Sequence, residues 1–172
     1  MPGRLQARRV VKAYRQTIEG TPERVFPLLC PVREVEWLDG WAYRMVHSVS
    51  GLVEPGAVFT TSAPGDADTV WVVSRHDPSL GIVEFCRFTA ESRTCLLRIA
   101  VSALDGQRSS VDVRYEYTSL SPAGDAFLDG FTDDVFLGAV RFWEASMNHF
   151  LTTGTRLARG PAAKATAGDD AS

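Results

Sequence analysis

The chain has 172 residues, of which 45% are hydrophobic and 23% charged, and its formal net charge is −3. This length suits about one domain, and the composition is that of a protein with a packed core. The slightly negative charge argues against a function that depends on broad neutralisation of nucleic-acid phosphates. No stretch approaches the roughly 20 apolar residues of a membrane span. We therefore expect neither a nucleic-acid partner nor integral membrane association.

The cysteines and histidines give no sign of a metal or cofactor site. Cys30, Cys86 and Cys95 are odd in number and lack metal-binding spacing. The three histidines are scattered along the chain, whereas a metal site needs several ligands to converge. We expect reduced thiols, a cytoplasmic location, no metal and no cofactor.

A single domain is predicted over residues 8–155. Residues 1–7 are interpreted as a loose start, because they contain few large apolar side chains. Residues 156–172 are rich in Ala, Gly and charge and have almost nothing large to bury. They are predicted to form a disordered tail.

The first elements are a strand and two short helices. Residues 8–19 carry β-branched and aromatic side chains without a helical period, which predicts a long strand. Thr21 then suits an N-cap, with a proline at the first helical position. Pro31 stops this helix. A second short helical turn is predicted over residues 33–37.

The middle of the chain predicts six more strands, separated by turns rich in Gly, Pro and Asp. They cover residues 43–49, 57–62, 69–76, 82–89, 93–104 and 109–120. Because the connections are short, these strands are expected to be antiparallel neighbours.

The last element is predicted to be one helix of about 30 residues, from Ser121 to a C-cap at Gly154. Its apolar residues recur at spacings of three and four: Phe127, Leu128, Phe131, Val135, Phe136, Ala139, Phe142, Trp143 and Phe150. The predicted class is therefore α+β, with a seven-stranded curved antiparallel sheet wrapped around this helix. A single helix does not fill such a concavity, so an internal cavity is expected.

Three stretches then carry a family resemblance. They are residues 18–41, which include IEGTPERVFPLL and WLDGW, residues 111–128, VDVRYEYTSLSPAGDAFL, and residues 142–154, FWEASMNHFLTTG. Together they resemble the START-like superfamily, also called SRPBCC or birch-pollen-allergen-like, which includes polyketide cyclase-like proteins. The resemblance implies a helix-grip fold and a hydrophobic-ligand cavity that opens near the short helices. Relatives bind lipids, hormones or polyketides, act as cyclases or aromatases, or assist chaperones, so the fold alone does not decide the activity.

The candidate ligand-binding residues are Trp37, Trp41, Trp71, Arg75, Glu84, Tyr115, Tyr117, Phe131, Val135 and Phe142. No catalytic residue is assigned. The two tryptophans of WLDGW either plug the core or line the mouth of the cavity. Tyr115 and Tyr117 share the row of their strand that is the better cavity wall. Arg75 and Glu84 form either an inward pair that orients a polar ligand group or a cross-strand ion pair on the surface.

The leading functional prediction is binding of a small hydrophobic molecule, lipid-like or polyketide-like, in the internal cavity. One alternative is a cyclase, aromatase or dehydratase that uses Tyr, Arg or Glu side chains in the same cavity. Another is a protein-interaction or chaperone-assisting module that uses the outer face of the sheet or the C-terminal tail. A homodimer is left open.

Overall fold

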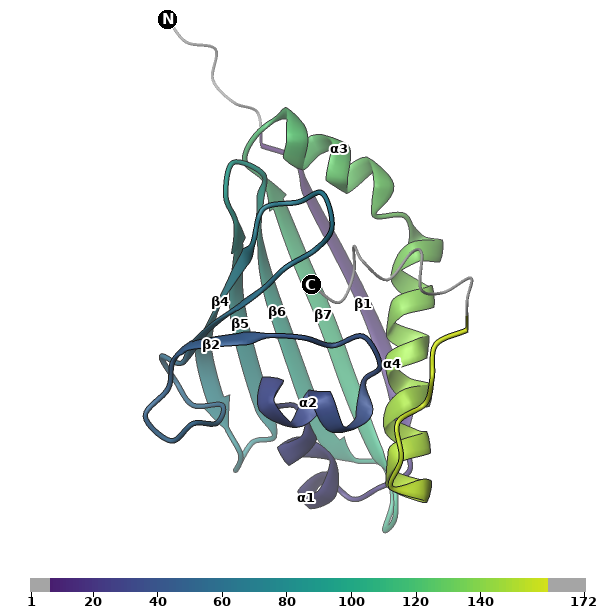
Figure 1. Ribbon diagram of the computed structural model, residues 1–172. Coiled ribbons are helices and arrows are strands. Elements are labelled where there is room, and N and C mark those ends of the chain that lie inside the picture. The colour runs from purple at the N-terminus through teal and green to yellow at the C-terminus, as the bar shows by residue number, and fades with distance from the viewer. Residues whose placement is uncertain (1–6, 161–172) are drawn as a thin grey trace, which may run out of the picture.

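A computed structural model describes residues 7–160. In this part of the chain seven antiparallel strands form one sheet in the order β1-β7-β6-β5-β4-β3-β2 (Figure 1). The strands are β1 (Arg9–Ile18), β2 (Arg44–His47), β3 (Val58–Thr61), β4 (Thr69–Asp77), β5 (Ile82–Thr89), β6 (Arg93–Ala103) and β7 (Ser109–Ser119). All seven predicted strands are confirmed. The first strand pairs with the last, so β1 and β2 are the two edges of the sheet.

The two short helices form where the sequence predicts them. Pro22 begins α1 (Pro22–Val25), which continues as the 3₁₀ helix η1 (Phe26–Leu28). Pro31 begins α2 (Pro31–Trp37). Both prolines stand at the first helical position, where the missing N–H leaves no hydrogen bond unmade.

The predicted single C-terminal helix is two helices, α3 (Pro122–Gly130) and α4 (Asp133–Thr153). Gly130 disfavours helix at the junction, and Phe131 leaves the helical conformation with a ψ of 61°. The Thr132 side chain then accepts a hydrogen bond from the backbone N–H of Val135, at 3.3 Å, and caps a new helix. The prediction of one uninterrupted helix was therefore wrong.

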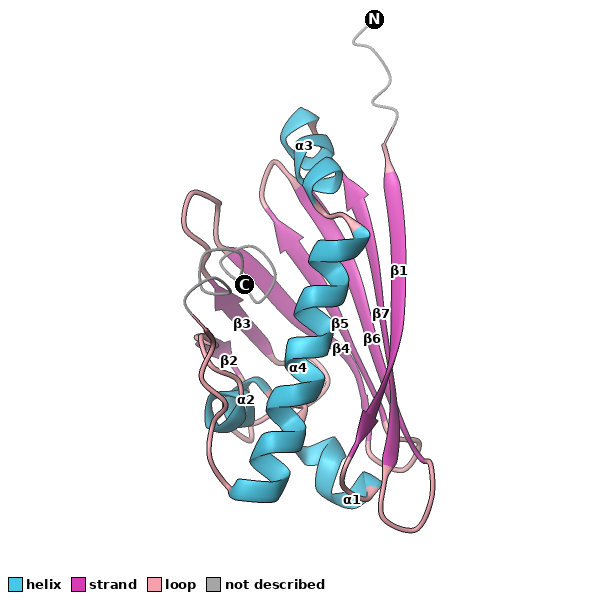
Figure 2. Ribbon diagram, turned by 90° about the vertical axis from the view of Figure 1, so that its right-hand side faces the viewer, coloured by secondary structure: helices cyan, strands magenta, loops and turns pink. Residues whose placement is uncertain are grey.

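Helix α4 crosses the concave face of the sheet, with α1 and α2 at one end and α3 at the other (Figure 2). Polar bonds attach α4 to the edge strand β1. The Gln16 side chain donates to the Val140 carbonyl at 2.9 Å, and Glu144 accepts from the backbone N–H of Thr17 at 2.6 Å. Asn148 donates to the Thr17 carbonyl at 3.0 Å. The helix is thus held over the β1 side and leaves part of the β3–β5 side uncovered.

The concave face buries alternate residues of β6 and β7, as their patterns predict. The inward rows include Cys95, Leu97, Ile99 and Val101 on β6, and Val111, Val113 and Tyr117 on β7. Under α3 and the start of α4, one group of buried side chains forms what we call the packed cluster. It consists of Cys95, Tyr117, Leu128, Phe131, Phe136 and Val140.

The chain continues past α4 along α2. Leu157 forms a parallel bridge with Leu38, and the backbone N–H of Arg159 donates to the Asp39 carboxylate at 2.9 Å. The predicted tail therefore begins too early, because residues 156–160 have defined contacts. Residues 161–172 of that tail, and residues 1–6 of the predicted loose start, lie outside the described residues. None of the helices in residues 7–160 combines the length and apolarity needed to cross a bilayer.

Candidate functional site

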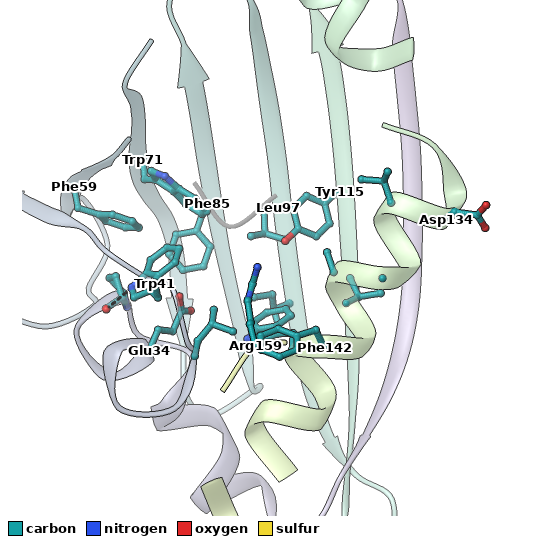
Figure 3. Close-up of a pocket in the computed structure, with 18 residues that line it drawn as sticks. Glu34, Trp41, Phe59, Trp71, Phe85, Leu97, Tyr115, Asp134, Phe142 and Arg159 are labelled. Carbon is teal, nitrogen blue, oxygen red and sulfur yellow. Dashed lines mark hydrogen bonds between the residues drawn. The ribbon is translucent and has the colours of Figure 1, made fainter. Parts of the chain in front are cut away.

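A pocket of about 370 Å³ lies between the concave face of the sheet, α2 and α4 (Figure 3). This volume lies in the range of small-molecule sites, about 300–1,000 Å³. Its wall contains seven aromatic side chains: Trp41, Phe59, Trp71, Phe85, Tyr115, Phe142 and Trp143. Three of the four tryptophans of the chain are among them. The pocket therefore offers flat apolar surfaces on several sides.

Contacts within the wall hold these aromatic rings in place. Phe59 and Trp71 are cross-strand neighbours, and their rings stack with centroids 5.1 Å apart. Trp41 meets Trp71 edge to face at 5.9 Å. The indole N–H of Trp41 donates to the Pro31 carbonyl, and that of Trp71 donates to the Thr61 hydroxyl, both at 2.9 Å. Because both indoles are packed and hydrogen-bonded, this part of the wall is preformed.

The short helix α2 presents one face to the pocket and another to the core. Pro31, Glu34 and Leu38 line the pocket at spacings of three and four residues, as one face of a helix requires. Trp37 points the other way and is fully buried. Its indole N–H donates to the Leu28 carbonyl at 3.1 Å, and its ring stacks on Trp143.

Glu34 brings a carboxyl group to this aromatic wall. Its side chain points into the cavity on the Trp41 side (Figure 3). Within residues 7–160 no group makes a hydrogen bond to the carboxyl of Glu34. The residue is half-buried, and its side chain lines the pocket. Burial raises the pKa of Glu34 to about 8, and the positive charge of Arg87 offsets only part of that rise.

Arg87 lies inside the fold, one inward position beyond the pocket residue Phe85 on β5. Its side chain is 4% exposed, and its guanidinium lies 4.1 Å from the centre of the Trp71 ring. The group donates to the Tyr117 hydroxyl at 3.0 Å. Arg87 therefore places a positive charge behind the aromatic wall, close enough to act on Glu34.

Arg159 reaches the pocket from the segment that follows α4. Its guanidinium lies 4.4 Å from the centre of the Phe142 ring and forms part of the pocket wall. In Figure 3 its side chain extends between Glu34 and Tyr115. The pocket thus combines an aromatic wall with the Glu34 carboxyl and the Arg159 guanidinium, which come from segments far apart in the sequence.

Comparisons with known proteins agree with this architecture. No family model matches the chain, and no curated protein matches it. Norcoclaurine synthase from Thalictrum flavum superposes with a TM-score of 0.66 at 9% identity, over 88% of this chain and 99% of that one. Ara h 8.0201 superposes with a TM-score of 0.59 at 14% identity, over 84% and 99%. DynU16, from the dynemicin biosynthetic locus, gives 0.58 at 12% identity, over 84% of this chain and 48% of that one.

The architecture of this chain is a helix-grip fold, a curved antiparallel sheet with a long C-terminal helix across it, as in these solved structures. The predicted fold class is therefore confirmed. At these identities the likeness concerns the fold alone, and the site has to be judged by its own residues.

Within the helix-grip fold, the predicted site residues fall into three groups. Trp41, Trp71, Tyr115, Val135 and Phe142 line the pocket. Trp37, Tyr117 and Phe131 are buried behind its wall. Arg75 and Glu84 lie outside it.

A β-bulge explains the position of Arg75. Trp71 and Val73 point inward, and the register of β4 then shifts between Val73 and Arg75, so that Arg75 pairs with the outward-facing Glu84. Arg75 bonds to Asp77 at 3.3 Å. The idea that Arg75 and Glu84 form an inward pair is therefore wrong, and Glu84 instead has a surface partner.

That partner is Arg98, opposite Glu84 on β6, at 3.6 Å. Beside this ion pair the outer face of the sheet exposes Val72, Phe88 and Leu96 on neighbouring strands. The protein-interaction alternative and the homodimer stay predictions.

In residues 7–160 no three potential metal-ligating side chains come together.

Sequence reasoning missed Glu34, Arg87 and Arg159. The spacing of Glu34 from Pro31 and Leu38, three and four residues, could have indicated that it shares a helical face with these two pocket residues. Arg87 follows Val83 and Phe85 in the inward row of β5, but a charged residue is normally expected to face solvent. Arg159 fell in the predicted tail.

Proposed function

We propose that this chain binds a small, mostly apolar molecule with a flat ring system in the pocket between α2, α4 and the sheet. The observation that supports this most directly is the preformed aromatic wall around about 370 Å³. Flat rings stack on aromatic side chains, whereas a flexible acyl chain gains less from a rigid aromatic surface. A polyketide-like ligand therefore fits this wall better than a fatty acyl chain.

A structural neighbour lends support to an aromatic guest. Norcoclaurine synthase from Thalictrum flavum has been solved in complex with dopamine and hydroxybenzaldehyde, which are both aromatic. The likeness concerns the fold, so the class of ligand is proposed for this chain from its own wall residues.

A second candidate is acid–base catalysis of the cyclase or dehydratase type on the same guest. Glu34 favours it, because a carboxyl group with a pKa of about 8 both gives and takes protons near neutral pH. Mass spectrometry of a guest recovered after incubation separates the two functions. A binding protein returns the guest unchanged, and an enzyme returns a product.

The binding proposal is tested with the apolar dye N-phenyl-1-naphthylamine. We expect one dye per chain, a rise in dye emission and quenching of the pocket tryptophans. Gly138→Leu should abolish binding, because Gly138 lines the pocket and a Cβ built on it meets nothing within 4 Å. The added side chain therefore begins in open space and takes up volume in the cavity.

Gly130→Leu is the matched control for this experiment. Gly130 also lies on a C-terminal helix and also has open space at its Cβ, but it does not line the pocket. It should leave dye binding unchanged. Failure of the wild-type chain to bind the dye, or equal binding by the two variants, would contradict the proposal.

A further inference from the structure

Two helix carboxyl groups that face the sheet differ sharply in their partners. Glu144 on α4 accepts from the backbone N–H of Thr17 at 2.6 Å and from the Tyr14 hydroxyl at 3.2 Å. Glu34 on α2 has no hydrogen-bond partner within residues 7–160 and points into the pocket. A carboxyl group in a pocket wall that bonds to no other side chain or backbone group keeps its hydrogen-bonding capacity for a guest. The Glu34 carboxyl is therefore placed to bond to a guest.

Charged and titratable side chains from several elements lie near Glu34. Arg87 lies behind the wall on β5, and Arg159 enters from the segment after α4. Tyr115 contributes a phenol from β7, and Asp39 follows α2 and holds the backbone of Arg159. Asp134 on α4 is exposed and borders the pocket, and in Figure 3 its carboxylate points away from Glu34.

The Glu34 carboxyl lies in the pocket wall and has no hydrogen-bond partner among residues 7–160. Burial also raises the pKa of Glu34 to about 8, so this carboxyl is mostly protonated at neutral pH. A protonated carboxyl donates one hydrogen bond, and its natural partner is a neutral oxygen acceptor.

We propose that Glu34 is a hydrogen-bond donor that recognises a carbonyl oxygen on a neutral, flat-ringed guest. This inference rests on the proposed binding function and names the preferred class of guest: aromatic ketones and quinones rather than the corresponding hydrocarbons. The aromatic wall supplies contact area, and Glu34 selects for the carbonyl. A few polar groups placed in a mostly apolar wall give such a site its specificity, and Glu34 is the one assigned here to the carbonyl.

The inference predicts a pH-dependent preference. Below pH 8 Glu34 is protonated and donates to the carbonyl. Above pH 8 it loses its proton, and the Glu34 carboxylate and the carbonyl oxygen of the guest are then both acceptors with no hydrogen between them. The affinity ratio of a ketone to a matched hydrocarbon should therefore be high at pH 6.5 and fall towards one at pH 9. The ratio cancels any general effect of charge on apolar binding.

The test uses 2-acetylnaphthalene and 2-ethylnaphthalene, which have similar shape but differ in the carbonyl group. Their dissociation constants are measured by tryptophan quenching at both pH values. For the wild type we expect the ketone to bind about five- to tenfold more tightly at pH 6.5. Glu34→Gln keeps an N–H donor and cannot ionise, so its preference should persist at pH 9. Glu34→Ala should lose the preference at both pH values.

Glu36→Gln is the matched control, because Glu36 lies on the same helix, is exposed and pairs with Arg33. It should behave like the wild type. Binding of neither naphthalene would overturn the proposed function and this inference with it. Binding of both, with the same ratio in Glu34→Ala as in the wild type, would overturn the inference alone.

Discussion

The pocket and the packed cluster occupy two parts of the same concave face and are both rich in aromatic side chains. In the packed cluster, Phe131 lies 4.9 Å from Tyr117 and 5.9 Å from Phe136, ring centre to ring centre. That end is covered by α3 and the start of α4. The pocket end has similar rings, and α2, α4 and the segment that follows α4 lie around it without filling it. Aromatic content therefore does not create the cavity; the placement of the helices does.

The two regions also treat buried charge differently. Near the packed cluster, Arg93 is buried over the Phe127 ring and bonds to the Asp66 carboxylate at 2.7 Å. In the pocket, the Glu34 carboxyl has no such bond within the described residues. Unpaired burial costs free energy that paired burial largely avoids. The pairing of Arg93 therefore favours the folded state, whereas the Glu34 carboxyl lowers the stability of the fold and remains available to a ligand.

The largest expected effect comes from removing one ring in each region. Phe131→Ala should lower the free energy of unfolding by about 3–4 kcal/mol, because Phe131 is surrounded by other rings. Phe142→Ala should cost about 1 kcal/mol, because Phe142 is half-buried and lines an existing cavity. Urea unfolding of both variants measures the difference. Equal losses would show that the pocket wall is as tightly packed as the cluster.

The fold was readable from the sequence because each strand carries its own pattern and is bounded by turn residues. The strand over residues 82–89 has the predicted bounds. The break between α3 and α4 was missed because Phe127, Phe131 and Phe136 continue an apolar pattern across it. Local signals for the break existed in Gly130 and the Thr132 cap, but a sustained apolar face outweighed them.

The site was less predictable, because its polar residues depend on tertiary contacts. A bulge in β4 turns Arg75 outward, and no local feature of the sequence marks that bulge. Arg87 is tolerated inside because Trp71 and Tyr117 hold its guanidinium, and both contacts come from other strands. Pocket aromatics such as Trp41 and Trp71 were easier to propose, because large aromatic side chains favour burial on the inner face of a sheet.

The next effect concerns the pH dependence of stability. The pKa of Glu34 is about 8 in the folded protein and about 4.5 in the unfolded chain. Between these values the folded protein holds a proton that the unfolded chain has released, so Glu34 makes folding less favourable as pH rises. Below pH 4.5 both states are protonated and the effect vanishes. Glu34→Gln should therefore stabilise the protein at pH 7.5, by on the order of 2 kcal/mol, and not at pH 4.5.

Urea unfolding of the wild type and Glu34→Gln at both pH values measures this difference. Glu36→Gln provides the comparison for a carboxyl on the exposed side of the same helix. A gain for Glu34→Gln that is the same at pH 4.5 and pH 7.5 would mean that burial does not disfavour the charged form of Glu34.

The smallest effect comes from the partnered carboxyl. Glu144→Gln keeps one oxygen acceptor for the backbone N–H of Thr17 but removes the charge that strengthens this bond. The variant should therefore lose about 1 kcal/mol of unfolding free energy at pH 7.5, where Glu34→Gln gains stability. The change from Glu to Gln should therefore alter the free energy of unfolding in opposite directions at two helix positions that face the same sheet. If Glu144→Gln also stabilised the protein, a hydrogen-bonded carboxylate would lower the free energy of unfolding as much as one without a partner. The proposed contrast between Glu144, which attaches α4 to β1, and Glu34, which faces the pocket, would then be wrong.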